Sequence, residues 1–74
     1  MSPEKMVRMA NQIAIFFKTQ PGDDAAEKIA QHLSDFWEPR MRDQLHAHVD
    51  AGGAGLDPLV IAADARIRTT TAEG

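Results

Sequence analysis

Apolar residues recur at spacings of three and four over the first part of the chain, which is the pattern of one face of an α-helix. The positions are Met6, Met9, Ala10, Ile13, Phe16 and Phe17. Ser2 can accept a hydrogen bond from a free amide of the first turn, and Pro3 loses no needed bond at the first helical position. The pattern therefore predicts a helix over residues 3–18.

A second stripe with the same spacing follows a loop that contains Pro21 and Gly22. Its members are Ala26, Ile29, Ala30, Leu33, Phe36 and Trp37. Asp24 with Glu27 three residues later resembles a capping box, so we predict a helix over about 24–37. A loop of about five residues is typical of antiparallel neighbours, which predicts a helical hairpin.

The hairpin predicts how the large side chains pack. Near the turn, Phe16 and Phe17 are expected to meet Ala26 and Ile29. At the open end, the second helix is expected to place the side chains Phe36 and Trp37 against Met6 and Met9.

Two shorter helices are predicted beyond the hairpin. Pro39 pushes Glu38 out of helical geometry and opens a helix over about 39–51, which the glycines after it end. Asp57 and Pro58 start another over about 58–68. We therefore predict an all-α fold, a small helical bundle in one domain over 1–68, with a disordered tail at 69–74.

Composition removes several classes of function. The chain has 74 residues, a net charge of −3 and no cysteine. It therefore has no thiolate metal ligand, iron–sulfur ligand or cysteine nucleophile. The acidic balance disfavours nucleic-acid binding, and no apolar run approaches a membrane span or a signal peptide.

Candidate chemistry is sparse, and we predict no catalytic, cofactor-binding or metal-binding residue. His46 and His48 point about 200° apart on a helix, so they cannot share a metal. His32 and Asp43 complete no ligand set visible in the sequence. A small metal-binding or ligand-binding helical protein that uses these side chains remains the alternative from another functional class.

The segment around Pro39 has the residue types found in protein interfaces. Its predicted partner-binding residues are Phe36, Trp37, Pro39, Arg40, Met41 and Arg42. In a second interpretation, Phe36 and Trp37 complete the hairpin core while Arg40 and Arg42 lie in solvent. Periodicity does not separate the two interpretations, and both can hold together.

Several segments together resemble one protein family, the delta subunit of the soluble, molybdenum-containing, NAD-dependent formate dehydrogenases. The similarity covers nearly the whole chain. Its carriers are residues 7–17 (VRMANQIAIFF), 29–33 (IAQHL), 36–42 (FWEPRMR) and 56–59 (LDPL). The first and third segments are the most specific.

The resemblance implies a small cytoplasmic accessory subunit, itself without a cofactor, that associates with the large catalytic subunits. It implies a role in assembly, stability or molybdenum cofactor maturation of an enzyme that uses flavin mononucleotide, iron–sulfur clusters and NAD. A maturation factor that binds only while the molybdenum cofactor is inserted is an alternative within this family. A self-associating structural module, homo-oligomeric when isolated, is another, because an unpartnered apolar stripe can pair with a second copy.

Overall fold

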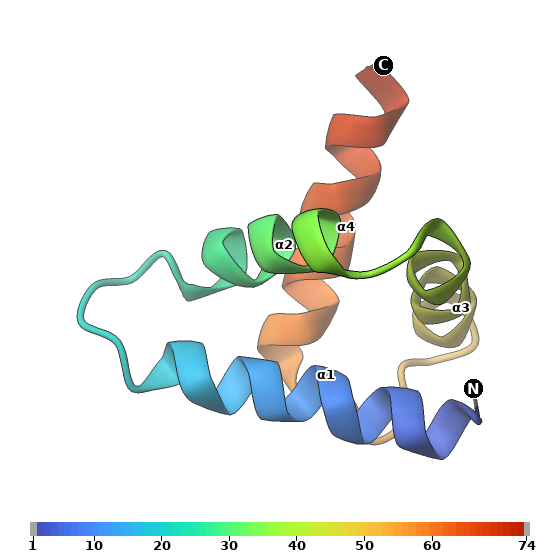
Figure 1. The fold of residues 1–74 in the computed structure, drawn as a ribbon, viewed down its shortest axis with the longest axis horizontal. Helices are drawn as coiled ribbons and strands as arrows, with labels where there is room; N and C mark the ends of the chain where they lie inside the picture. The colour runs from blue at the N-terminus through green and yellow to red at the C-terminus, as the bar shows by residue number, and fades with distance from the viewer. Residues whose placement is uncertain (1, 74) are drawn as a thin grey trace.

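The computed structural model describes the backbone of residues 2–73 and the side chains of residues 2–68. Over this range the chain forms four helices and no strand, which confirms the all-α prediction. The helices are α1 (Pro3–Lys18), α2 (Ala25–Phe36), α3 (Pro39–Asp50) and α4 (Pro58–Glu73). Figure 1 shows α1 and α2 running in opposite directions, as the hairpin prediction requires.

Three of the predicted helix starts are confirmed by their local geometry. Ser2 Oγ accepts a hydrogen bond from the Lys5 amide at 3.2 Å. Glu38 is extended, with ψ 154°, directly before Pro39. Asp57 Oδ1 accepts from the Leu59 amide at 2.9 Å. Ser2 and Glu38, each directly before a proline, have extended backbone geometry. All three prolines begin their helices, at a position that needs no amide donor.

The predicted capping box at Asp24 is wrong. The Asp24 side chain makes no capping hydrogen bond, because its φ of −106° and ψ of 27° lie outside the extended geometry that turns a cap side chain toward the first amides. Its carboxylate instead lies 3.5 Å from Lys28 Nζ, one helical turn further on. Asp24 still precedes α2, so the predicted element survives without the predicted bond.

A Schellman motif ends α3. The Gly53 amide donates to His48 O at 2.9 Å and the Gly52 amide donates to Val49 O at 3.0 Å, which satisfies two of the last free carbonyls. Gly52 has a φ of 121°, a conformation that side chains with a Cβ rarely adopt. The glycine-rich segment is therefore a helix terminator, as predicted.

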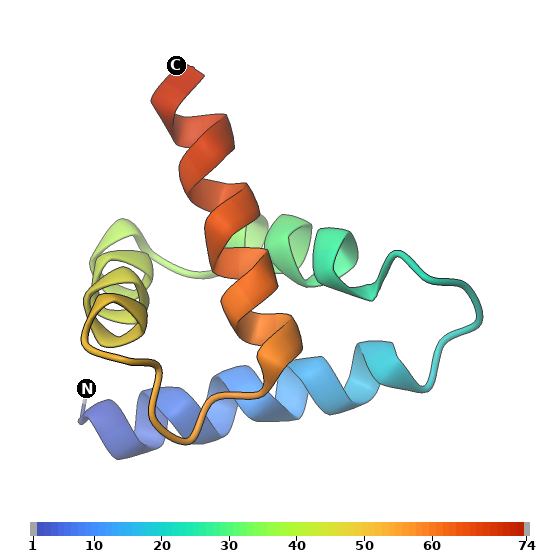
Figure 2. The same ribbon diagram turned by 180° about the vertical axis from the view of Figure 1, so that it is seen from behind.

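The core is shared by all four helices rather than by the hairpin alone. α4 begins beside α1, crosses α2 and extends past the rest of the fold (Figures 1 and 2). α2 packs more extensively on α4 than on α1. The largest completely buried apolar side chains are Met6, Ile29, Leu33, Leu45 and Val60. The hairpin prediction therefore gives the antiparallel directions of α1 and α2 correctly. It does not include α4, on which α2 packs more extensively than on α1.

α4 ends later than predicted. The helix continues through Glu73, whereas the apolar pattern indicated an end near residue 68. The side chains of residues 69–74 lie outside the described part, so the predicted disorder of the tail stays a prediction.

The segment that joins α3 to α4 is held against α1 by side-chain contacts. Asn11 Nδ2 donates to Gly55 O and Asn11 Oδ1 accepts from the Asp57 amide, both at 2.8 Å. Lys18 forms an ion pair with the Asp57 carboxylate. Asn11 belongs to a segment that carries the family resemblance, and its role here is to fix this connection.

The ion pair predicts acid sensitivity. Burial favours the neutral Asp57 carboxyl, but the Lys18 hydrogen bond, the Leu59 amide and the Lys18 charge outweigh it and hold the pKa of Asp57 below its ordinary value. Ionised Asp57 therefore stabilises the fold above the carboxyl pKa of the unfolded chain. This contribution is lost as pH falls through the lower folded-state pKa.

Asp57→Asn is expected to reduce stability at neutral pH and to flatten the fall in thermal midpoint between about pH 5 and about pH 2. Circular dichroism melts across this range measure both effects. Asp43→Asn, at an exposed position on α3, is the control and should keep the wild-type slope. Equal slopes for wild type and Asp57→Asn would contradict the assignment.

Candidate functional site

An open apolar groove of about 450 Å³ lies between α1 and α2. We call it the aromatic groove, and its lining residues are Met9, Gln12, Ile13, Phe16, Phe17, His32, Phe36 and Trp37. None of these side chains is acidic or carries a permanent positive charge, although 26% of the chain is charged. The groove is therefore suited to an apolar occupant.

Four rings form a continuous row along the groove. Phe16 packs edge-on against Phe17 with ring centroids 5.1 Å apart, and Phe17 packs edge-on against His32 at 5.9 Å. His32 then lies 4.8 Å from Phe36 in a tilted arrangement. Such pairs are favourable aromatic geometries, and they hold the rings in place before anything binds.

The outer rings of this row, Phe16 and Phe36, are exposed. This corrects the prediction that Phe16 packs into the hairpin core, and it contradicts the interpretation in which Phe36 completes that core. Phe16 is 59% exposed and Phe36 is 72% exposed. The buried residues of α2 are Ile29, Ala30 and Leu33, and Trp37, directly after the helix, lies four residues beyond Leu33. Phe36 lies one residue off the line of Ile29, Leu33 and Trp37. The predicted stripe therefore contains both core residues and groove walls.

The predicted partner-binding residues, which we call the corner, differ in burial. They are Phe36, Trp37, Pro39, Arg40, Met41 and Arg42. Trp37 is only 6% exposed and belongs to the core, which confirms that part of the second interpretation. Phe36, Pro39 and Arg40 are exposed, and Met41 and Arg42 are half-buried. Arg42 Nη1 donates to Ser34 O at 3.2 Å and ties the start of α3 to the end of α2.

The three histidines lie in separate environments. His32 belongs to the aromatic groove, and His48 Nε2 lies 2.8 Å from Ala54 O. His46 Nδ1 contacts Asp64 Oδ1, and because a carboxylate only accepts, His46 donates from Nδ1. Asp43 is exposed on α3. Within the described residues, no three His, Cys, Asp or Glu side chains are grouped as a metal would require.

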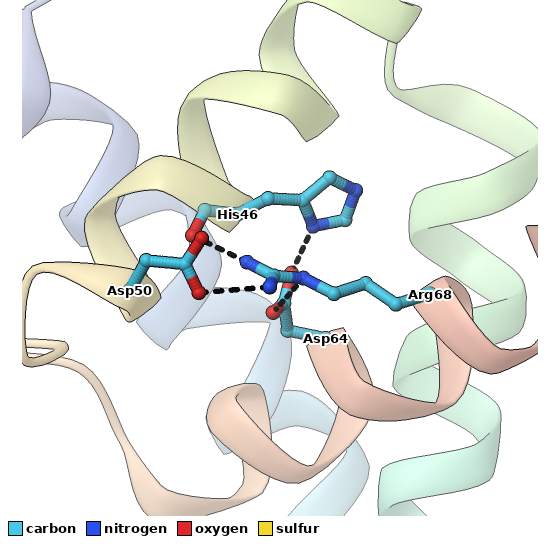
Figure 3. A network of polar contacts seen from close by, with 4 residues as sticks. All are labelled: His46, Asp50, Asp64 and Arg68. Carbon is cyan, nitrogen blue, oxygen red and sulfur yellow. Dashed lines mark hydrogen bonds and ion pairs between the residues drawn. The ribbon is translucent and has the colours of Figure 1, made fainter. Parts of the chain in front are cut away.

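His46 is part of a charged cluster that joins α3 to α4 (Figure 3). Asp64 is 1% exposed, and its Oδ2 lies 3.0 Å from Arg68 Nε, an ion pair without hydrogen-bond geometry. Arg68 Nη1 lies 2.8 Å from Asp50 Oδ1, and Arg68 Nη2 donates to His46 O. The buried carboxylate thus has two basic partners, one from each helix.

The electrostatics of this cluster keep Arg68 charged. The Asp50 hydrogen bond raises the pKa of Arg68, burial lowers it, and the charge of Asp64 raises it further. Sequence reasoning missed the cluster. The available signal was Asp64 and Arg68 at a spacing of four, with Asp64 within an otherwise apolar stripe of α4.

No helix in the part of the chain that the structure describes is long and apolar enough to cross a membrane.

Comparisons with known proteins give the chain a family. A search of curated proteins found no match. The family model described as NADH-dependent formate dehydrogenase delta subunit FdsD matches residues 5–63. This range contains every residue that lines the aromatic groove and most of the 74-residue chain. The chain therefore belongs to the FdsD family, the delta subunits of NADH-dependent formate dehydrogenase.

Proposed function

We propose that this chain is a non-catalytic accessory subunit of an NAD-dependent formate dehydrogenase. In this proposal it binds the large catalytic subunits in the cytoplasm. It supports assembly, stability or molybdenum cofactor maturation of the complex through protein–protein contacts. The molybdenum cofactor, iron–sulfur clusters and flavin mononucleotide belong to the complex and not to this chain.

The observation that carries the proposal is the exposed aromatic row in a member of a subunit family. Exposed apolar patches of this kind mark interaction sites. The rings of Phe16 and Phe36 are preordered by their neighbours, which lowers the entropy cost of binding. The partner surface extends from the aromatic groove to the exposed part of the corner, Pro39 and Arg40, with Met41 and Arg42 at its edge.

Trp37 supports this surface from inside. It lines the inner wall of the aromatic groove while it is almost completely buried in the core. Its substitution would disturb folding as well as binding. The test of the proposal therefore uses the exposed rings.

Phe16→Ser and Phe36→Ser are each expected to weaken binding to the catalytic subunits about tenfold or more, as truncation of an aromatic anchor does. Size-exclusion chromatography and biolayer interferometry with the purified subunits measure the loss. Ile15→Ser is a matched control, because Ile15 neighbours Phe16, is 58% exposed and lies outside the groove.

Wild-type affinity for Phe16→Ser and Phe36→Ser would remove the groove from the proposal. Failure of the wild-type chain to bind any catalytic subunit would contradict the accessory role itself. If this chain is present in purified active enzyme, it is a permanent subunit. If it is recovered only with enzyme that lacks its molybdenum cofactor, it is a maturation factor.

A further inference from the structure

We propose that α3 opens from the other three helices as one unit, while α1, α2 and α4 stay folded, and that the charged cluster holds it closed. Three features of the molecule carry this proposal. They are the small apolar contact of α3, the hydrogen bonds within its own segment, and the way the charged cluster divides between α3 and α4.

Apolar burial attaches α3 less firmly than the other helices. α3 lies at one edge of the fold, beside the first turns of α1 (Figures 1 and 2). Leu45 is the one buried residue of this helix, all of which is described, whereas each other helix buries at least three residues. Met41 and Val49 add partly buried contacts. Over the described residues α3 has the least extensive contacts with the other helices, and such regions open first in a folded protein.

Local hydrogen bonds make the α3 segment one cooperative unit. At its start, the amides of Met41 and Arg42 donate to Glu38 O. At its end, the Schellman motif joins residues of the same segment, and His48 Nε2 lies 2.8 Å from Ala54 O. These bonds form and break together when residues 38–54 dock and open.

The segment is bounded by two points about which it can turn. Glu38 has extended backbone geometry between α2 and α3. On the other side, Asn11 binds Gly55 O and the Asp57 amide, so the chain is fixed to α1 from Gly55 onward. Gly55 has a φ of 79° and lacks a Cβ, which leaves its backbone free to rotate. The α3 segment can therefore leave while the start of α4 stays in place.

The charged cluster closes α3 onto α4 and can also release it (Figure 3). His46 Nδ1 donates to Asp64, and Arg68 Nη1 lies 2.8 Å from Asp50 Oδ1, so opening breaks both contacts. Asp64 and Arg68 both belong to α4 at a spacing of four, so their ion pair persists while water solvates the carboxylate. Opening therefore avoids the large cost of a buried charge without a partner.

Opening changes the shape of the predicted partner surface. Arg40 and Met41 lie on α3, whereas Phe36 lies on α2, so the open form moves one part of the corner away from the aromatic groove. A partner that contacts both parts binds the closed form and shifts the population toward it. This consequence rests on the proposed function, but the opening itself is a property of the chain alone.

Hydrogen exchange of the isolated full chain, resolved for each amide by nuclear magnetic resonance, tests the opening. A detached helix of 12 residues is not stable in water, so its amides exchange when the segment opens. The interior amides of α3 are expected to exchange about tenfold faster than those of α2 or more, with a weaker dependence on low concentrations of urea. Equal rates, or the same urea dependence in both helices, would overturn the proposal.

Ile29→Val separates local opening from global unfolding. Ile29 is completely buried in α2, and it stays buried when α3 opens. Loss of one methyl group is expected to speed exchange of the α2 amides about fivefold, while the α3 amides keep their wild-type rates. An equal acceleration of both helices would mean that α3 exchanges only by global unfolding, which contradicts a separate opening.

His46→Ala tests the charged cluster. It removes the donor to Asp64 and is expected to speed exchange of the α3 amides about tenfold. Asp43→Ala, at an exposed position on the same helix, is the control and should keep wild-type rates. Unchanged α3 exchange in His46→Ala would overturn the role of the cluster. Failure of the chain to bind any catalytic subunit would contradict the proposed function and leave the opening standing.

Discussion

Replacing Trp37 with alanine is expected to lower the free energy of unfolding by about 3–5 kcal/mol, the cost of truncating a buried tryptophan. The side chain ends the inward line of α2 and packs in the cluster that joins the helices. Domains of this size have roughly 4–11 kcal/mol in total. Trp37→Ala should therefore leave a substantial unfolded population at 37 °C.

Phe36→Ala is the matched control for this change. It removes a ring of similar character from the preceding residue, but Phe36 is 72% exposed, so stability should change by about 0.5 kcal/mol or less. Urea unfolding followed by circular dichroism measures both variants without relying on tryptophan fluorescence. Equal midpoints for the two variants would contradict the division between core and groove.

Local sequence signals predicted the helix ends well because each depends on a few neighbouring residues. Pro39 and Pro58 fix the starts of α3 and α4, and Gly52 provides the backbone conformation that ends α3. Asp24 is the exception, since its conformation follows from how the loop before α2 enters the helix. The same periodicity could not show which side of α2 would be covered.

Tertiary packing determines which side of α2 is covered. Ile29, Leu33 and Trp37 are buried in the core that α4 shares. Phe36 is left exposed beside the aromatic groove. A hairpin considered alone contains no information about α4. The charged cluster was missed for the same reason: His46 and Asp64 are far apart in the sequence, and only the crossing of α3 with α4 brings them together.

Asp64→Ala is expected to be the second most damaging change, with a loss of about 3 kcal/mol of unfolding free energy. Removing the buried carboxylate leaves a cavity and an unpaired His46 ring, whereas Arg68 keeps Asp50 as its remaining acidic partner. Here Arg68 Nε and the His46 ring would lose their shared carboxylate in the contact between α3 and α4. Asp64→Asn, which keeps the shape and an acceptor oxygen, should lose less.

Asp43→Ala is the control, because Asp43 is an exposed carboxylate on α3 outside the cluster, and its change should stay within about 0.5 kcal/mol. Urea titrations of wild type, Asp64→Ala, Arg68→Ala and the double variant form a thermodynamic cycle. Because the two residues share one interaction, the double variant should lose less than the sum of the single losses. Additive losses would mean that Asp64 stabilises the fold without coupling to Arg68, and the two residues would then not act as one cluster.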